Sequence, residues 1–153
     1  MQEQNRKSSF PIVMLLVSVV LWIASLSNVA FYLGNHESMK GVTVLIFGSI
    51  FVSLDIRYCA AYANYVWLAA IVLLALRKKV VPVHAALWGL ALVAFSVKAV
   101  HVDEAGNTAD IVRYGAGFYL WYAAFVVATI GTFAGKNKER KAATLADGTK
   151  NDA

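Results

Sequence analysis

The sequence predicts an all-α, polytopic membrane protein: a four-helix transmembrane bundle with an extra short interfacial or re-entrant helix on its outer side. Of the 153 residues, 59% are hydrophobic. Four long apolar stretches contain no Asp, Glu, Lys or Arg except Lys98, and they cover 10–33, 60–76, 80–99 and 114–134. At about 1.5 Å of rise per residue, roughly 20 apolar residues cross a hydrocarbon core about 30 Å thick. We therefore expect a single four-span domain over 1–135.

The first apolar stretch, 10–33, is expected to remain in the protein as its first transmembrane helix. It follows Arg6 and Lys7, as the apolar part of a signal peptide would. Its 24 residues exceed the about 7–15 of such a segment, and the sequence around Ser27 offers only poor cleavage sites. A cleaved signal peptide is the alternative.

The distribution of Lys and Arg predicts the orientation in the membrane. Ten of the fourteen lie in the N-terminal tail, in the 77–79 turn or after residue 135, and the other four accompany five acidic residues on the opposite side. Basic residues favour the cytoplasmic side, so both termini are expected in the cytoplasm. Four spans and two cytoplasmic termini agree in parity. The same pattern accounts for the net charge of +5 without nucleic acid as a partner.

Two further segments complete the predicted organisation. The apolar segment 41–54 has only 14 residues, too few to cross comfortably, so we expect it to lie on the outer leaflet or to dip into it. A single bent helix that continues into the second span is the alternative. The tail over 136–153 is polar and basic and is predicted to be disordered, because it cannot bury enough apolar area to offset the cost of ordering.

Polar residues near the outer ends of the spans are candidates for a binding site. They form a predicted outward-facing cluster of Asn28, Arg57, Asn64, Lys98, Arg113 and Tyr119. Polar groups at membrane depth are functional candidates by default. The alternative is that these groups hydrogen-bond to one another to hold the bundle, while the charged ones reach the lipid headgroups. Asp55 and Arg57 are two residues apart and can pair only if the chain turns there.

Aromatic and small residues are interpreted structurally. The four tryptophans and most of the seven tyrosines are expected to form belts at the membrane interfaces, with an aromatic ligand platform as the alternative. Ala124, Ala128 and Thr132 repeat every four residues in the last span, which favours close helix packing. These faces are expected to meet inside the monomer, and a homo-oligomer is the alternative.

Catalytic and metal-binding patterns are not evident in the sequence. The three histidines lack ligand spacing and Cys59 is the single cysteine. No nucleophile–base arrangement is visible, and no paired intramembrane carboxylate is present that could relay protons. We therefore expect no metal, no cofactor and no enzymatic activity.

The segment from Gly117 to Phe125 reads GFYLWYAAF, and the second span begins with Tyr62-Ala63-Asn64. In these two motifs the chain resembles a small class of bacterial inner-membrane proteins with four spans. These proteins carry Gly-x-Tyr-Leu-Trp at the start of the last span and aromatic-Ala-Asn, usually followed by Pro, at the start of the second. Here Tyr65 replaces the proline. The resemblance implies a bacterial inner membrane and the importance of Asn64, Gly117, Tyr119 and Trp121, but it carries over no activity.

Three functions are compatible with these observations. The first is a non-enzymatic binding protein, either an accessory subunit of a larger membrane complex or an immunity protein against a pore-forming toxin. The second is a small oligomeric transporter or channel, suggested by Asn28, Arg57 and Asn64. The third is an enzyme acting on lipid or quinone, for which no base, nucleophile or metal is visible. The lipid bilayer, another membrane protein or a toxin are the expected partners.

Overall fold

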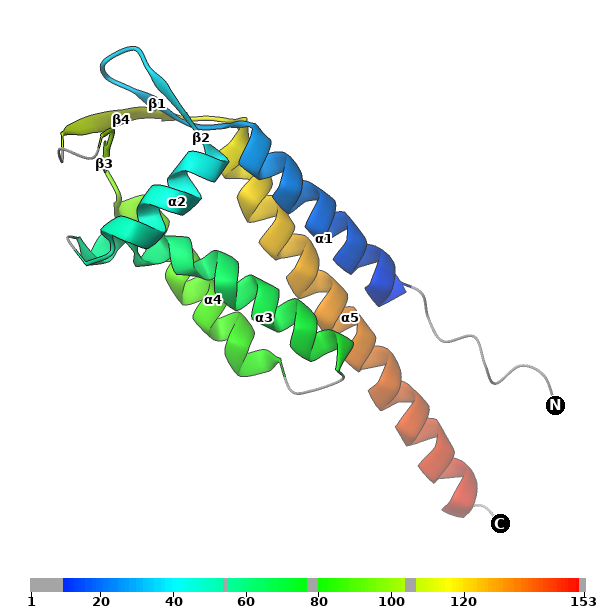
Figure 1. The fold of residues 1–153 in the computed structure, drawn as a ribbon. Coiled ribbons are helices and arrows are strands. Elements are labelled where there is room, and N and C mark those ends of the chain that lie inside the picture. Colours follow the sequence, from blue (N-terminus) through cyan, green and yellow to red (C-terminus); the bar gives the residue numbers. More distant parts are fainter. Residues whose placement is uncertain (1–9, 54, 77–79, 104–106, 152–153) are drawn as a thin grey trace.

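The computed structural model describes residues 10–53, 55–76, 80–103 and 107–151. The fold is mostly helical, with a four-stranded sheet at one end of the helices (Figure 1). In chain order the helices are α1 (Phe10–Ser27), α2 (Gly41–Phe51), η1 (Ile56–Tyr62), α3 (Ala63–Ala75), α4 (Val81–Val93), η2 (Ala94–Ser96) and α5 (Ala116–Asn151). The strands are β1 (Val29–Leu33), β2 (Ser38–Lys40), β3 (Ala99–His101) and β4 (Thr108–Tyr114).

Four helices, α1, α3, α4 and α5, run between the sheet and the opposite end of the molecule (Figure 1). We call the end that carries the sheet the sheet end. Helix α1 ends there, α3 begins there, α4 ends there and α5 begins there. The start of α1, the end of α3 and the start of α4 all lie at the opposite end. The segments that contain the four strands and α2 lie at the sheet end.

The sheet is the feature that the predicted all-α fold lacks. Its strand order is β2-β1-β4-β3, and every neighbouring pair is antiparallel. The predicted span 10–33 is helical only to Ser27, and the predicted span 80–99 leaves its helix after Ser96. A continuous apolar run does not distinguish helix from strand by periodicity, which is why 29–33 was expected to be helical. The β-branched and aromatic residues in that run favour the strand.

The break between α1 and β1 has a local cause at Asn28. Its side-chain amide donates to the Ala24 carbonyl at 2.8 Å, and its backbone N–H donates to the same carbonyl at 3.2 Å. A short polar side chain that binds the preceding turn in this way competes with continued helix. The chain then turns into β1, whose Ala30 carbonyl accepts from the Gly115 N–H at 2.7 Å.

Helix α2 lies within the predicted short helix 41–54 and is docked through two glycines. A Cβ on Gly41 would lie 2.3 Å from the Ser25 carbonyl oxygen, and a Cβ on Gly48 would lie 2.8 Å from the Ala61 Cβ. Only glycine permits these approaches to α1 and η1. The separation of seven residues places both glycines on one face of α2.

Among the described residues, two helical segments are long and apolar enough to cross a membrane, Ile56–Leu74 and Ala116–Ala134. They match the predicted spans 60–76 and 114–134. The apolar helices Ile12–Ser27 and Val81–Ser96 are shorter, because strands complete the other two predicted spans. Helix α5 continues to Asn151, into the 136–153 segment for which the sequence predicts a disordered tail.

The core has two parts. Below the sheet, buried residues include Phe31, Met39 and Phe118. Farther along the bundle, buried residues of α3, α4 and α5 include Trp67 and Phe125. The outward faces of the helices carry large aliphatic side chains, such as Ile12, Leu16, Val20, Val72, Leu92 and Ile130, each at least 50% exposed.

Candidate functional site

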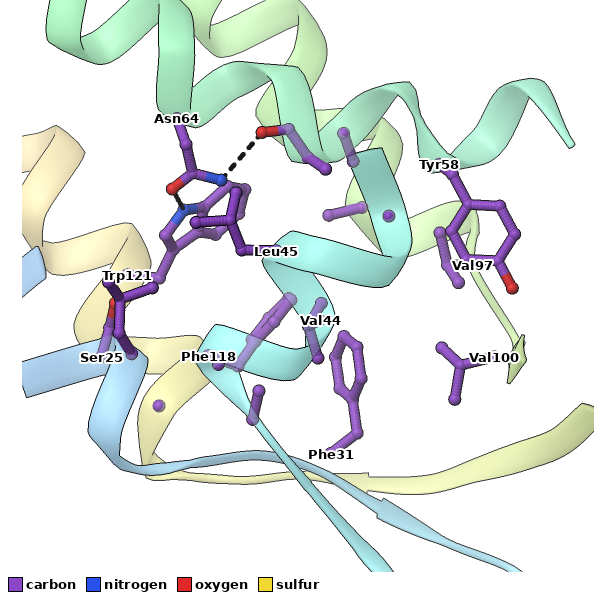
Figure 2. A pocket seen from close by; sticks show the side chains of 18 of the residues that line it. Ser25, Phe31, Val44, Leu45, Tyr58, Asn64, Val97, Val100, Phe118 and Trp121 are labelled. Atoms are coloured by element: carbon purple, nitrogen blue, oxygen red, sulfur yellow. Dashed lines mark hydrogen bonds between the residues drawn. The ribbon is translucent and has the colours of Figure 1, made fainter. Parts of the chain in front are cut away.

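Asn64, in the first turn of α3, joins three helices through its side-chain amide. Its Oδ1 accepts from the indole N–H of Trp22 in α1 at 2.7 Å and from that of Trp121 in α5 at 2.8 Å. Its Nδ2 donates to the Ala61 carbonyl at 2.9 Å (Figure 2). An indole N–H can only donate, so the acceptor oxygen must face the two tryptophans. Asn64 is 5% exposed, and the arrangement is therefore a buried polar contact within the bundle.

A second polar contact lies one layer deeper. The indole N–H of Trp67 donates to the Ser18 hydroxyl at 3.0 Å, and that hydroxyl donates to the Ala124 carbonyl at 2.7 Å. Trp67 and Ser18 are both fully buried. The Trp22 and Trp67 rings stack with their centroids 5.1 Å apart. Helices α1, α3 and α5 are thus joined twice.

Helix α4 is joined to α5 by similar contacts. The Trp88 indole N–H donates to the Thr129 hydroxyl at 3.2 Å. His84 lies 3.0 Å through Nδ1 from the Val80 carbonyl and 3.4 Å through Nε2 from the Thr132 hydroxyl. His84 is 4% exposed, so these contacts lie inside the bundle.

The four tryptophans are hydrogen-bonded between helices of the bundle, and the interfacial belt stays a prediction for them. Each of the four indole N–H groups donates to a side chain of another helix. Inside a bundle, this use of the ring gives packing area and a hydrogen bond together. For the tyrosines the belt stays a prediction, and Tyr62, Tyr65 and Tyr119 are exposed on the outside of the helices.

A cavity of about 80 Å³ lies between the sheet and the Asn64 contact (Figure 2). It is lined from α1, β1, α2, η1, α3, β3 and α5, and by residues around η2. Its lining is mostly apolar, with Phe31, Val44, Val97 and Phe118 among the larger side chains. Four lining residues are polar: Ser25, Arg57, Tyr58 and Asn64.

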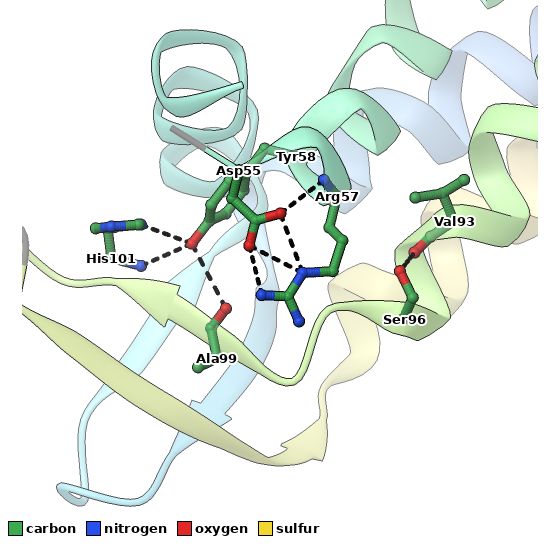
Figure 3. A network of polar contacts seen from close by, with 7 residues as sticks. All are labelled: Asp55, Arg57, Tyr58, Val93, Ser96, Ala99 and His101. Carbon is green, nitrogen blue, oxygen red and sulfur yellow. Dashed lines mark hydrogen bonds and ion pairs between the residues drawn. The ribbon is translucent and has the colours of Figure 1, made fainter. Parts of the chain in front are cut away.

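The polar edge of the cavity is formed where η1 begins (Figure 3). Asp55 is extended, at φ −144° and ψ 116°, and it caps η1 by accepting from the Arg57 backbone N–H at 2.9 Å. The turn lets the two side chains pair, with Arg57 Nε 2.9 Å from Asp55 Oδ2. The sequence allows this pairing only if the chain turns at these residues, and the structure has such a turn. The hydrogen bonds from Arg57 hold the pKa of the Asp55 carboxyl below its usual value.

Tyr58 and His101 connect η1 to the sheet. The Tyr58 hydroxyl lies 2.8 Å from His101 Nδ1 and accepts from the His101 backbone N–H at 3.1 Å (Figure 3). The Phe51 ring stacks on the imidazole with centroids 4.7 Å apart, so α2 takes part in the same contact. Among the described residues, no three His, Cys, Asp or Glu side chains gather as a metal site would require.

The structure divides the predicted polar cluster. Asn64 and Arg57 line the cavity, together with the motif residues Gly117 and Trp121. The other four do not line it: the Asn28 amide turns back onto α1, Lys98 is exposed, Tyr119 is 62% exposed, and the Arg113 guanidinium lies 4.3 Å from the centre of the Tyr32 ring in the sheet.

The motif residues of α5 acquire distinct roles. A Cβ on Gly117 would lie 2.7 Å from the Asn28 carbonyl oxygen and 2.9 Å from that of Ser25, so glycine permits the close approach of α1 and α5. Trp121, one helical turn later, donates to Asn64. Sequence reasoning missed Trp22 and Ser18, whose partners lie 42 to 106 residues away.

Comparison with models of protein families, with curated proteins and with solved structures finds no match to this chain.

Proposed function

We propose that this chain is a non-enzymatic, four-span protein of a bacterial inner membrane that binds another protein through the sheet at its outer face. The partner would be the larger complex that it serves as an accessory subunit, or a pore-forming toxin against which it gives immunity. The single observation that carries the proposal is the sheet itself. Its inner side packs on the bundle through Phe31 and Met39, and Tyr32, Val112 and Arg113 remain exposed.

The distribution of polar and apolar side chains supports the membrane location. Five polar residues are buried between the described elements: Ser18, Ser25, Asn64, His84 and Thr132. Large aliphatic residues such as Leu16, Val20 and Leu92 face outward at 61–64% exposure. Water would penalise this arrangement over such a continuous surface, whereas a hydrocarbon solvent favours buried polar contacts and apolar outer faces.

The positions of the basic residues relative to the helix ends support the proposed orientation. The basic residues of the N-terminal tail and of the 77–79 turn are adjacent in sequence to helix ends that lie away from the sheet, and those after residue 135 belong to the half of α5 that extends away from the sheet. The positive-inside rule then favours the cytoplasm for that end and the periplasm for the sheet end.

The exposed side of the sheet has the chemistry of a protein-binding surface. We define the sheet surface as Tyr32, Val112 and Arg113. Val112 is 69% exposed, and Arg113 lies over the Tyr32 ring. Tyrosine and arginine are enriched where proteins bind one another, because each offers both packing area and polar contacts.

The alternative, a small oligomeric transporter or channel, was suggested by Asn28, Arg57 and Asn64. The side chains of these residues are engaged with Ala24, Asp55 and the two tryptophans, respectively. The lining of the cavity is mostly apolar. These observations favour binding over passage of a polar solute.

Native extraction of the protein from its source membrane into lipid nanodiscs, followed by mass spectrometry, tests the proposed function. We expect a protein partner at fixed stoichiometry. Val112→Glu should remove the partner, because a charge introduced into the sheet surface opposes its burial under a partner. Thr108→Glu, the same change at an exposed position at the other end of β4, is the matched control and should retain it. Partner-free protein in every preparation would contradict the proposal.

A further inference from the structure

The cavity beneath the sheet offers no polar group in need of a ligand. The Ser25 hydroxyl donates to the Trp22 carbonyl at 2.6 Å, Tyr58 binds His101, and Arg57 pairs with Asp55. Within the described part of the chain, no buried side-chain nitrogen or oxygen lacks a hydrogen-bond partner. A cavity with a mostly apolar lining and satisfied polar atoms favours an apolar guest over water.

The size of the cavity limits that guest. Its volume is about 80 Å³. An engineered apolar cavity of about 150 Å³ binds a benzene molecule, so roughly half that volume suits a slim hydrocarbon segment more than a ring system. The guest would therefore place a short apolar end in the cavity and leave the rest of the molecule outside.

Helix α2 separates the cavity from the outside of the bundle. Val44, Leu45 and Gly48 of α2 line the cavity. Ile46 and Ile50 on its other side are 51% and 60% exposed. The wall is thus a single helix of 11 residues with apolar side chains on both faces. A hydrocarbon phase beyond α2 would contact the apolar outer face of the helix, and the face toward the cavity is apolar as well.

We propose that the cavity holds the end of a phospholipid acyl chain, which enters sideways from the outer leaflet past α2. The inference rests on the proposed membrane location and not on the proposed protein partner. An acyl chain is a slim apolar segment, and its headgroup stays outside the cavity. The half-exposed Arg57 marks the edge of the lining that reaches the polar surroundings.

Photolabelling in nanodiscs tests the inference on the full chain. The probe is phosphatidylcholine with a diazirine near the end of one acyl chain, and peptide mass spectrometry locates the adducts. We expect adducts on the cavity residues Val97 and Phe118, in addition to adducts on the outward-facing Leu16 and Val20, which contact any surrounding lipid. Adducts at Leu16 and Val20 with none at the cavity residues would overturn the inference and leave the membrane location intact.

Variants that fill the cavity make the test specific. Ala94 lines the cavity and is 7% exposed, so Ala94→Leu should lower labelling of Val97 and Phe118 at least fivefold. Ala85→Leu makes the same change at an exposed position of α4 and should leave the labelling unchanged. Val44→Phe fills the cavity from the opposite wall and serves if Ala94→Leu does not fold. Undiminished labelling in a folded filling variant would overturn the inference.

Two further outcomes separate the source of the guest from the location of the protein. A free diazirine alkane that labels the cavity residues, with no labelling by the lipid probe, would assign the cavity to a soluble apolar molecule and overturn the acyl-chain proposal. Absence of adducts at Leu16 and Val20 would contradict the membrane location, and with it both the proposed function and this inference.

Discussion

Replacement of Asn64 by leucine tests whether the buried amide holds the bundle together. Leucine resembles asparagine in size but leaves the indole N–H groups of Trp22 and Trp121 without their acceptor. Hydrogen bonds between helices in a membrane protein contribute about 0.6 kcal/mol on average and up to about 1.7 kcal/mol. Two such bonds lost together predict a decrease of about 1–3 kcal/mol in the free energy of unfolding. The measurement is reversible unfolding of the purified protein in mixed micelles.

A double-mutant cycle distinguishes this reasoning from a general packing defect. Trp121→Phe removes one N–H donor, so its effect should be about 0.6–1.7 kcal/mol smaller in the Asn64→Leu background than in the wild type. Trp88→Phe is the matched control, because its N–H donates to Thr129 and its effect should add to that of Asn64→Leu. Additive effects of Trp121→Phe, or a loss below about 0.3 kcal/mol for Asn64→Leu, would refute the reasoning.

Three other predictions follow from local geometry. Gly117→Ala should lower the melting temperature, because its Cβ would lie 2.7 Å from the Asn28 carbonyl oxygen and 2.9 Å from that of Ser25 in α1. Gly89→Ala meets nothing within 4 Å and should be neutral or stabilising. The lowered pKa of Asp55 stabilises the folded state at pH values above the ordinary carboxyl pKa, and this stability is lost as the pH falls through the folded-state pKa. The melting temperature should therefore decrease less between pH 6 and pH 3 in Asp55→Asn than in the wild type. Topology reporters fused after Lys79 and near Gly106 should score cytoplasmic and periplasmic, respectively, and the reverse result would contradict the proposed orientation.

The sequence predicted some parts of the fold better than others, and the difference depended on the length of each apolar run. The runs 60–76 and 114–134 correspond to the two helical segments long enough to span a membrane. The run 10–33 concealed a helix and a strand, because its residues are apolar on both sides of Asn28 and show no period that separates the two. The short helix over 41–54 was predicted from its length, and the structure adds the two glycines that dock it.

The candidate site was predicted only in part, for a related reason. Asn64, Arg57, Gly117 and Trp121 stood out as polar or motif residues, and all four line the cavity. Their common partners could not be identified, since the hydrogen bonds of Asn64 reach 42 and 57 residues along the chain. Their positions within the predicted spans indicated a similar depth, but they did not indicate which helix faces meet. Lys98 and Tyr119 were predicted at the same depth, and the structure leaves both exposed.

The response of stability to lipid provides a second, thermodynamic consequence of the cavity. A ligand that binds only the folded state raises the free energy of unfolding by about 2.7 kcal/mol at one hundred times its dissociation constant. Filling the cavity has two opposing intrinsic effects on stability. It removes a cost of about 2 kcal/mol, from 80 Å³ at about 24 cal/mol per Å³, and overpacking adds a cost of about 1–3 kcal/mol. The difference between lipid-rich and lipid-poor micelles removes these intrinsic effects. Ala94→Leu should therefore lose most of the lipid-dependent increase in melting temperature that wild type and Ala85→Leu retain, and an equal increase in all three proteins would mean that the stabilising lipid binds elsewhere.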